Sequence, residues 1–155
     1  MAVDIQTILV ATDFSDASAP ATAYAFSLAR ALNIRVYLMH VVPEGDVRMI
    51  TAVRTYLQSE VTPETLVDVF YTEAAKRLAA LVEAAHATEL VQERLVVTGD
   101  PAAELVRYAA AQHVQLIIIG THGRRGVSRF LLGSVAERVL REAPCAVLVV
   151  PVTPS

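Results

Sequence analysis

Short apolar runs rich in β-branched residues alternate along the chain with longer stretches in which apolar residues recur at helical spacing. Five runs have the length and composition of strands, at residues 7–11, 35–41, 94–98, 116–120 and 146–150. These runs are apolar at nearly every position, which indicates strands that are buried on both faces. The alternation therefore predicts parallel strands connected by helices that cover both sides of a sheet.

The first two connections differ in regularity. Apolar residues recur at helical spacing over 21–32, and Asn33 follows where a left-handed cap residue is expected. The longer second connection has an apolar stripe at 49–57. A helix should then run from Thr62-Pro63 to about residue 87, because threonine caps helices and proline suits their first turn.

The last two helices carry clear start signals. Asp100-Pro101 predicts a helix that ends near residue 112. A final helix is expected at 134–142, before a proline that stops it. Ser134 and Glu137 have the spacing of a capping box, in which each side chain binds a backbone N–H of the first turn.

Together the elements predict an α/β fold with an open, doubly wound, five-stranded parallel sheet and helices on both faces. Strands and helices alternate without an internal repeat, linker or low-complexity segment, which indicates a single domain over residues 1–155. In such sheets, ligands bind beyond the carboxyl ends of the strands, where the strand order reverses. We expect the functional residues there.

Composition excludes several classes of protein. Hydrophobic residues make up 54% of the chain and charged residues 19%, so disorder is not expected. A formal net charge of −3 argues against a nucleic-acid partner, because phosphate backbones require a broad basic surface. No apolar stretch approaches the roughly 18 to 20 residues that span a bilayer, and the first ten residues do not resemble a secretory signal. We therefore expect a cytoplasmic protein with no membrane partner.

Candidate catalytic and metal-binding residues are sparse. The single cysteine, Cys145, excludes an internal disulfide, and its apolar surroundings predict a buried, unreactive thiol. His40 and His122 flank the expected ligand edge, but neither has an evident acid or nucleophile partner. His86 and His113 are expected on helix surfaces. No catalytic role is assigned to any residue.

Glycine is concentrated in one segment. Four of the six glycines lie within residues 120–133, after the fourth strand and before the last helix. Glycine lets a bound group approach the backbone closely, and the N–H groups at a helix N-terminus bind phosphate. Arg124, Arg125 and Arg129 would add positive charge. These features favour an anion site over a purely structural turn with solvated arginines, although neither the P-loop nor the dinucleotide fingerprint is present.

The segment resembles the signature G-x2-G-x9-G-[S/T] of the universal stress protein family, in its ATP-binding branch. Gly120, Gly123, Gly133 and Ser134 match it in full. Similarity extends to ILVATDFSDAS near the start, HVVP, GDPAAELV, and GSVAERVLREAPCAVLVVP near the end. Residues 44–70 have no recognisable match. The resemblance implies the strand order 3-2-1-4-5 and a role in the response to stress.

The resemblance also implies a site for ATP. In that site the glycines and Ser134 hold the triphosphate, Asp13 lies near the ribose or a Mg²⁺ ion, and the backbone of Val41 recognises adenine. The other residues of the set are Ala11, Arg124 and Val135. Two alternatives stay open, because Asp13 would serve equally well in a turn with Ser15 or Asp16, and Val41 in strand packing.

A homodimer through the strand at 146–150 is expected. This strand is short, apolar and uncharged, so at a sheet edge it requires a cover or a partner. The resemblance implies a symmetric pair formed through it, which closes on itself.

Three functions are considered, and an ATP-binding regulatory module with little or no hydrolysis is favoured. A slow ATPase or adenine-nucleotide hydrolase is the first alternative, but no water-positioning residue is evident. The related hydrolases also carry an SGGxDS-like loop where this chain has ATDFSD. A nucleotide-free interaction protein is the second alternative, and the intact glycines argue against it.

Overall fold

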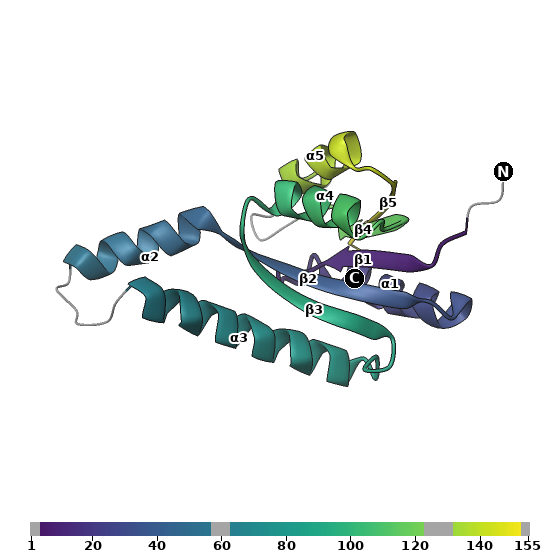
Figure 1. Ribbon diagram of the computed structural model, residues 1–155, viewed down its shortest axis with the longest axis horizontal. Helices are drawn as coiled ribbons and strands as arrows, with labels where there is room; N and C mark the ends of the chain where they lie inside the picture. The colour runs from purple at the N-terminus through teal and green to yellow at the C-terminus, as the bar shows by residue number, and fades with distance from the viewer. Residues whose placement is uncertain (1–3, 57–62, 123–131, 153–155) are drawn as a thin grey trace.

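A five-stranded parallel sheet forms the centre of the structure, a computed structural model that describes residues 4–56, 63–122 and 132–152 (Figure 1). The strands are β1 (Thr7–Ala11), β2 (Arg35–Pro43), β3 (Val91–Gly99), β4 (Leu116–Gly120) and β5 (Ala146–Val150). They lie in the order β3-β2-β1-β4-β5, and all four pairings are parallel. The doubly wound sheet with order 3-2-1-4-5 is thereby confirmed, and its strand order reverses between β1 and β4.

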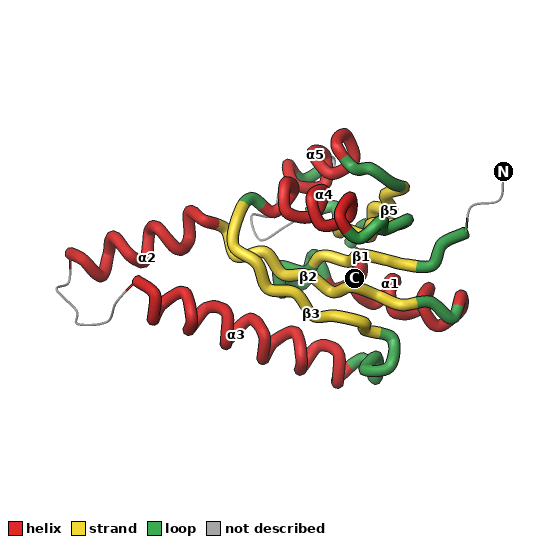
Figure 2. Tube along the Cα trace, in the orientation of Figure 1, coloured by secondary structure: helices red, strands yellow, loops and turns green. Residues whose placement is uncertain are grey.

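Helices cover both faces of this sheet, as Figure 2 shows. The helices are α1 (Ala19–Leu32), α2 (Glu44–Tyr56), α3 (Pro63–Ala84), α4 (Pro101–Ala111) and α5 (Ser134–Glu142). One face packs against α1 and α3, and the other against α4 and α5. Helix α2 continues from the end of β2 and extends away from the sheet beside the start of α3 (Figure 1). No helix in the described ranges combines the length and apolar composition needed to cross a membrane.

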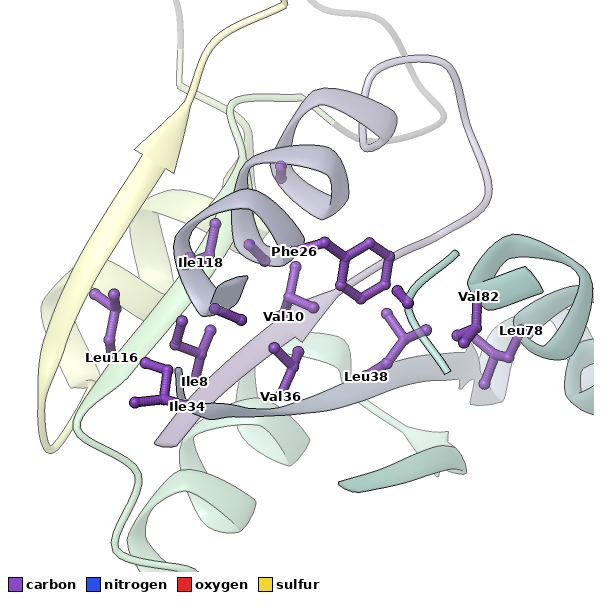
Figure 3. Close-up of a cluster of buried hydrophobic side chains, with 14 residues drawn as sticks. Ile8, Val10, Phe26, Ile34, Val36, Leu38, Leu78, Val82, Leu116 and Ile118 are labelled. Atoms are coloured by element: carbon purple, nitrogen blue, oxygen red, sulfur yellow. The ribbon is translucent and has the colours of Figure 1, made fainter. Parts of the chain in front are cut away.

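The core has two layers because successive side chains of a strand point to opposite faces. Ile8 and Val10 of β1 lie in the layer under α1 and α3, in one cluster with Phe26 of α1 and Leu78 of α3 (Figure 3). Leu9, between them, lies in the other layer, under α4 and α5. Burial on both faces explains why the strands are apolar at nearly every position.

Most predicted boundaries are confirmed to within a few residues, but β2 and β3 are longer than expected. β2 continues to Pro43, and β3 spans Val91–Gly99, so that Pro43 pairs with Gly99. Polar and turn-forming residues at these ends obscured the strand pattern. Because β2 extends so far, α2 begins at Glu44 without a connecting loop.

Residues with a left-handed backbone conformation follow the ends of three helices. Asn33 has φ 54° and ψ 47°, as predicted for the residue after α1. His86 and His113, expected on helix surfaces, instead take the same role after α3 and α4, with φ of 50° and 52°. In each case the next residue donates its N–H back into the last turn, as when Val114 binds the Ala109 carbonyl at 2.9 Å.

The predicted helix starts had mixed outcomes. The Asp100 carboxylate caps α4 by accepting a hydrogen bond from the Ala103 N–H at 2.8 Å, as expected. Thr62 lies outside the described residues. The capping box at Ser134 is wrong, because Gly133 is the N-cap of α5 and no side chain caps this helix. The Gly133 N–H donates to the Thr121 carbonyl at 2.7 Å, which keeps Gly133 extended and makes Ser134 the first helical residue.

The thiol of Cys145 generates a prediction. Cys145 is free and partly buried, and desolvation raises its pKa above the ordinary value, although a hydrogen bond from the Ile117 backbone opposes the shift. Because the thiolate is the nucleophile, we expect alkylation by iodoacetamide to be slower in the folded chain than in urea. The pH at which the alkylation rate rises should also be higher in the folded chain than in urea. Mass spectrometry across a pH series measures both curves, and coincident curves would contradict the prediction.

Candidate functional site

A pocket of about 590 Å³ opens at the carboxyl edge of the sheet, where the strand order reverses. Its walls come from the ends of β1, β2 and β4, the loop after β1, and the first turns of α2, α4 and α5. Its volume falls within the range of about 300–1,000 Å³ that is typical of small-molecule sites. The pocket lies where the fold class predicted a ligand site.

Most of the predicted site residues meet in this pocket. Its lining includes seven of them, namely Ala11, Asp13, Val41, Gly120, Gly133, Ser134 and Val135. Gly123 and Arg124 lie outside the described residues, as do Arg125 and Arg129. The pocket thus joins residues from segments that are far apart in the sequence.

Two glycines of the signature are required by contacts between backbone segments. A Cβ on Gly120 would lie 2.9 Å from the carbonyl oxygen of Ala17, in the loop between β1 and α1. A Cβ on Gly133 would lie 2.9 Å from the carbonyl oxygen of Thr121. Both distances are shorter than a side chain tolerates, so these glycines let the chain close on itself beside the pocket. The structural interpretation of the glycines therefore holds at these two positions and is compatible with a ligand site.

Asp13 lies in a hydrogen-bonded turn beside the pocket. Its Oδ1 accepts hydrogen bonds from the N–H of Ser15, at 3.0 Å, and from the Ser15 hydroxyl. Thr12 reinforces the same loop, because its hydroxyl oxygen accepts from the Phe14 N–H and lies 3.2 Å from Ser18 Oγ. Asp13 is thus a turn residue, as one alternative proposed, and also lines the pocket.

The histidines at this edge take part in structural hydrogen bonds, as expected. His40 is buried, and its Nδ1–H donates to the Thr12 carbonyl at 2.9 Å. Its ring also packs on Phe14, with 4.4 Å between centroids. His122 shares a hydrogen bond of 3.0 Å with the hydroxyl of Thr121 and lines the pocket.

The backbone of Val41 faces the pocket because β2 is longer than β1. The pairing of the two strands ends at Ala11 and Met39, and the Thr12 N–H donates to the Met39 carbonyl at 2.9 Å. In a parallel strand, backbone groups of every second residue point to the same side. The N–H and C=O of Val41 therefore point past the end of β1.

The two ends of the pocket differ in chemistry. The β2 end is lined by apolar side chains and two carboxylates, from Met39, Val41, Pro43, Asp46, Asp100, Pro101 and Leu105. The opposite end holds Gly133, Ser134 and the first turn of α5, whose free N–H groups carry partial positive charge. The pocket therefore suits an elongated ligand with an apolar, amino-bearing end and an anionic end.

Sequence reasoning missed most residues at the β2 end. Asp100 was identified only as a helix cap, and it also accepts a hydrogen bond of 2.6 Å from Arg138 of α5. Leu105 lies one turn after Pro101 on α4. Asp46 lies in a stretch with no clear pattern. Their only sequence signal was proximity to a strand end, which does not identify the side chains that face a pocket.

No group of three or more histidine, cysteine or acidic side chains that could hold a metal occurs among the residues that the structure describes. Mg²⁺ commonly binds through one or two carboxylates together with substrate phosphates.

Comparison with known proteins agrees with this architecture. The model of the universal stress protein family matches residues 4–151. The universal stress protein MJ0531 of Methanocaldococcus jannaschii is 34% identical over 143 residues, which cover 92% of this chain and 80% of that protein. The universal stress protein YxiE of Bacillus subtilis is 31% identical over 147 residues, covering 92% and 97%.

Two solved structures are similar over almost their whole length. The protein MJ0577 superimposes with a TM-score of 0.76 and 26% identity, and the match covers 99% of this chain and 100% of that one. A universal stress protein in complex with cAMP superimposes with a TM-score of 0.63 and 28% identity, covering 96% and 98%.

Replacement of Gly133 by alanine tests the close contact beside the pocket. We expect Gly133→Ala to lower the free energy of unfolding by about 1–3 kcal/mol, because the added methyl group overlaps the Thr121 carbonyl. Gly45→Ala is the matched control, since nothing lies within 4 Å of its Cβ position and alanine favours a helix. Urea denaturation measures the free energy of unfolding of both variants. If Gly133→Ala were as stable as the unmodified chain, the close contact with the Thr121 carbonyl would be contradicted.

Proposed function

The chain belongs to the universal stress protein family, and on this basis we propose that it is an ATP-binding regulatory module that hydrolyses ATP slowly if at all. The observation that carries the proposal is the asymmetry of the pocket, which has apolar side chains and two carboxylates at the β2 end and backbone N–H donors at the α5 end. An adenine nucleotide has the same asymmetry. A solved member of the family is in complex with cAMP, which supports this class of ligand.

The phosphates would lie at the start of α5. Gly133 and Ser134 line the pocket there, and the first N–H groups of a helix bind anions. Because Ser134 is the first helical residue and not the cap, its hydroxyl is not required to cap α5. We propose that Gly123 and Arg124 complete the phosphate site, as the family signature implies.

The sugar and the base would follow toward β2. Asp13 and Ala11, at and after the end of β1, also line the pocket, and the Asp13 carboxylate would meet the ribose or a Mg²⁺ ion brought by the phosphates. The backbone N–H and C=O of Val41 face past β1, and these groups complement the edge of adenine. Apolar side chains at this end would pack against the faces of the ring.

We base the proposal of slow hydrolysis on the surroundings of Asp13. A general base must accept a proton from water, but Asp13 Oδ1 already accepts two hydrogen bonds from Ser15. These bonds hold the carboxylate in the turn after β1. We therefore propose that ATP occupancy, and not ATP turnover, is the functional state.

We also propose a homodimer that forms through β5. This strand lies at one edge of the sheet, so one row of its backbone groups lacks a neighbouring strand within the described fold. Val152, just beyond it, is 44% exposed. A symmetric contact would cover both features.

Titration with ATP tests the nucleotide site. We expect ATP to bind in magnesium buffer, and Ser134→Ala to weaken binding about fivefold through loss of one hydrogen bond. Ser27→Ala, on the exposed side of α1, is the matched control and should bind as the unmodified chain does. Calorimetry measures all three affinities. Absence of heat from the unmodified chain would overturn the proposal, and a release of phosphate that Ser134→Ala abolishes would favour the ATPase alternative.

Sedimentation tests the dimer. We expect a dimer at micromolar concentration, and a shift toward monomer in Val152→Lys, because the new charges would be brought together across the two-fold contact. Glu89→Lys is the control substitution, because Glu89 is exposed after α3 and far from β5 in the sheet order. A monomer in the unmodified chain would contradict the proposal.

A further inference from the structure

The turn after β1 contains a residue in a costly backbone conformation. Phe14 has a positive φ of 63°, a left-handed conformation that bulky side chains rarely adopt. Asn33, His86 and His113 also have positive φ, but they follow helix ends, where this conformation is common. Phe14 follows no helix, and glycine would adopt its conformation without the cost. The phenyl ring is therefore expected to make a contact that offsets the strain.

The strained residue lies inside the turn that forms one wall of the pocket. The Asp13 carboxylate accepts hydrogen bonds from the N–H and the hydroxyl of Ser15, so this turn spans Phe14. The Phe14 N–H donates to the Thr12 hydroxyl oxygen at 3.0 Å. Thr12 and Asp13 line the pocket, as does Ala11 before them. The backbone conformation of Phe14 therefore determines the shape of this wall.

The ring of Phe14 contacts side chains from two other elements. It packs on the His40 ring of β2, with 4.4 Å between centroids, and the guanidinium of Arg77 on α3 lies 4.2 Å from its centroid. The ring face carries partial negative charge, so it attracts the cation. The position of Arg77 on α3 is set by its neighbours Ala74 and Leu78, which are buried. The contact thus connects the turn after β1 to a helix that is anchored in the core.

The packing around the ring leaves it room to move. Phe14 is only partly buried, and together with Arg77 and Ala74 it lines a second cavity of about 180 Å³. A ring that borders such a cavity can change position without displacing the core. The contact with Arg77 therefore contributes to keeping the ring, and with it the backbone of Phe14, in place.

We infer that Arg77 is a positioning residue for the nucleotide. By holding the ring of Phe14, it keeps the turn over residues 11–15 in the shape that lines the pocket. This inference rests on the proposed function, because it requires the nucleotide to contact that turn. Arg77 lines the second cavity and is not among the residues that line the pocket, so it acts through Phe14.

The experiment measures the affinity for ATP by calorimetry in magnesium buffer. It uses the unmodified chain, Arg77→Gln, Arg77→Lys and Lys76→Gln. Glutamine removes the charge of arginine, and lysine retains it. Lys76 is the matched control, because it is the exposed neighbour of Arg77 on α3 and carries the same charge. Its replacement lowers the net charge equally but leaves the cation over the Phe14 ring in place.

We expect Arg77→Gln to weaken ATP binding about threefold to fivefold, the effect of one exposed cation–π contact. Arg77→Lys should bind ATP within about twofold of the unmodified chain, and Lys76→Gln should bind it equally well. Unchanged affinity in Arg77→Gln would overturn the inference and leave nucleotide binding intact. An equal loss in Arg77→Lys or in Lys76→Gln would also overturn it.

A second pair of variants separates positioning from a general loss of stability. Phe14→Gly removes both the ring and the cost of the left-handed conformation, so Arg77→Gln should weaken ATP binding no further in that background. A further threefold loss there would show that Arg77 acts by another route and would overturn the inference. Urea denaturation establishes that each variant is folded under the conditions of the titration.

If Arg77→Gln does not fold, Phe14→Leu decides the question. Leucine keeps an apolar side chain and the strain but has no ring face for the cation, so ATP binding should weaken at least about threefold. Unchanged affinity would overturn the inference. A failure of the proposed function would look different, since the unmodified chain would then bind no ATP and the inference would fall with it.

Discussion

The close approach of two backbone segments at the switch point is the constraint on which the site depends. Gly120 lies against the carbonyl of Ala17, and Gly133 lies against the carbonyl of Thr121, to which it also donates a hydrogen bond of 2.7 Å. These contacts bring the end of β4, the loop after β1 and the start of α5 to one place. They leave no room for a Cβ. The N-terminus of α5 therefore opens into the pocket, and the signature glycines have a structural role even before a ligand is considered.

Unequal strand lengths form the other end of the site. β2 continues beyond β1, so the backbone groups of Val41 are directed past the neighbouring strand, and α2 begins at once. The same parallel pairing that satisfies most backbone groups in the sheet thus leaves a few directed past the end of β1. The position of such groups depends on strand length and leaves no side-chain signature.

The loop after β1 connects the pocket to the opposite face of the sheet. Hydrogen bonds from Thr12 and Asp13 hold its turn, and Phe14 takes a positive φ of 63°. Its ring packs on His40 and lies 4.2 Å from the guanidinium of Arg77 on α3. The residue next to the pocket-lining carboxylate is therefore fixed by α3.

The sequence by itself determined the local elements and much of the site. Apolar periodicity located the strands, Asn33 and Asp100 marked helix ends, and the glycine spacing identified Gly120, Gly133 and Ser134, which line the pocket. Strand order came from the family resemblance. Only the tertiary structure decided that Gly133 caps α5, that β2 extends beyond the end of β1, and that Asp46 lines the pocket. Periodicity and capping are properties of neighbouring residues, whereas a pocket wall depends on register and strand length between distant segments, which no local pattern encodes.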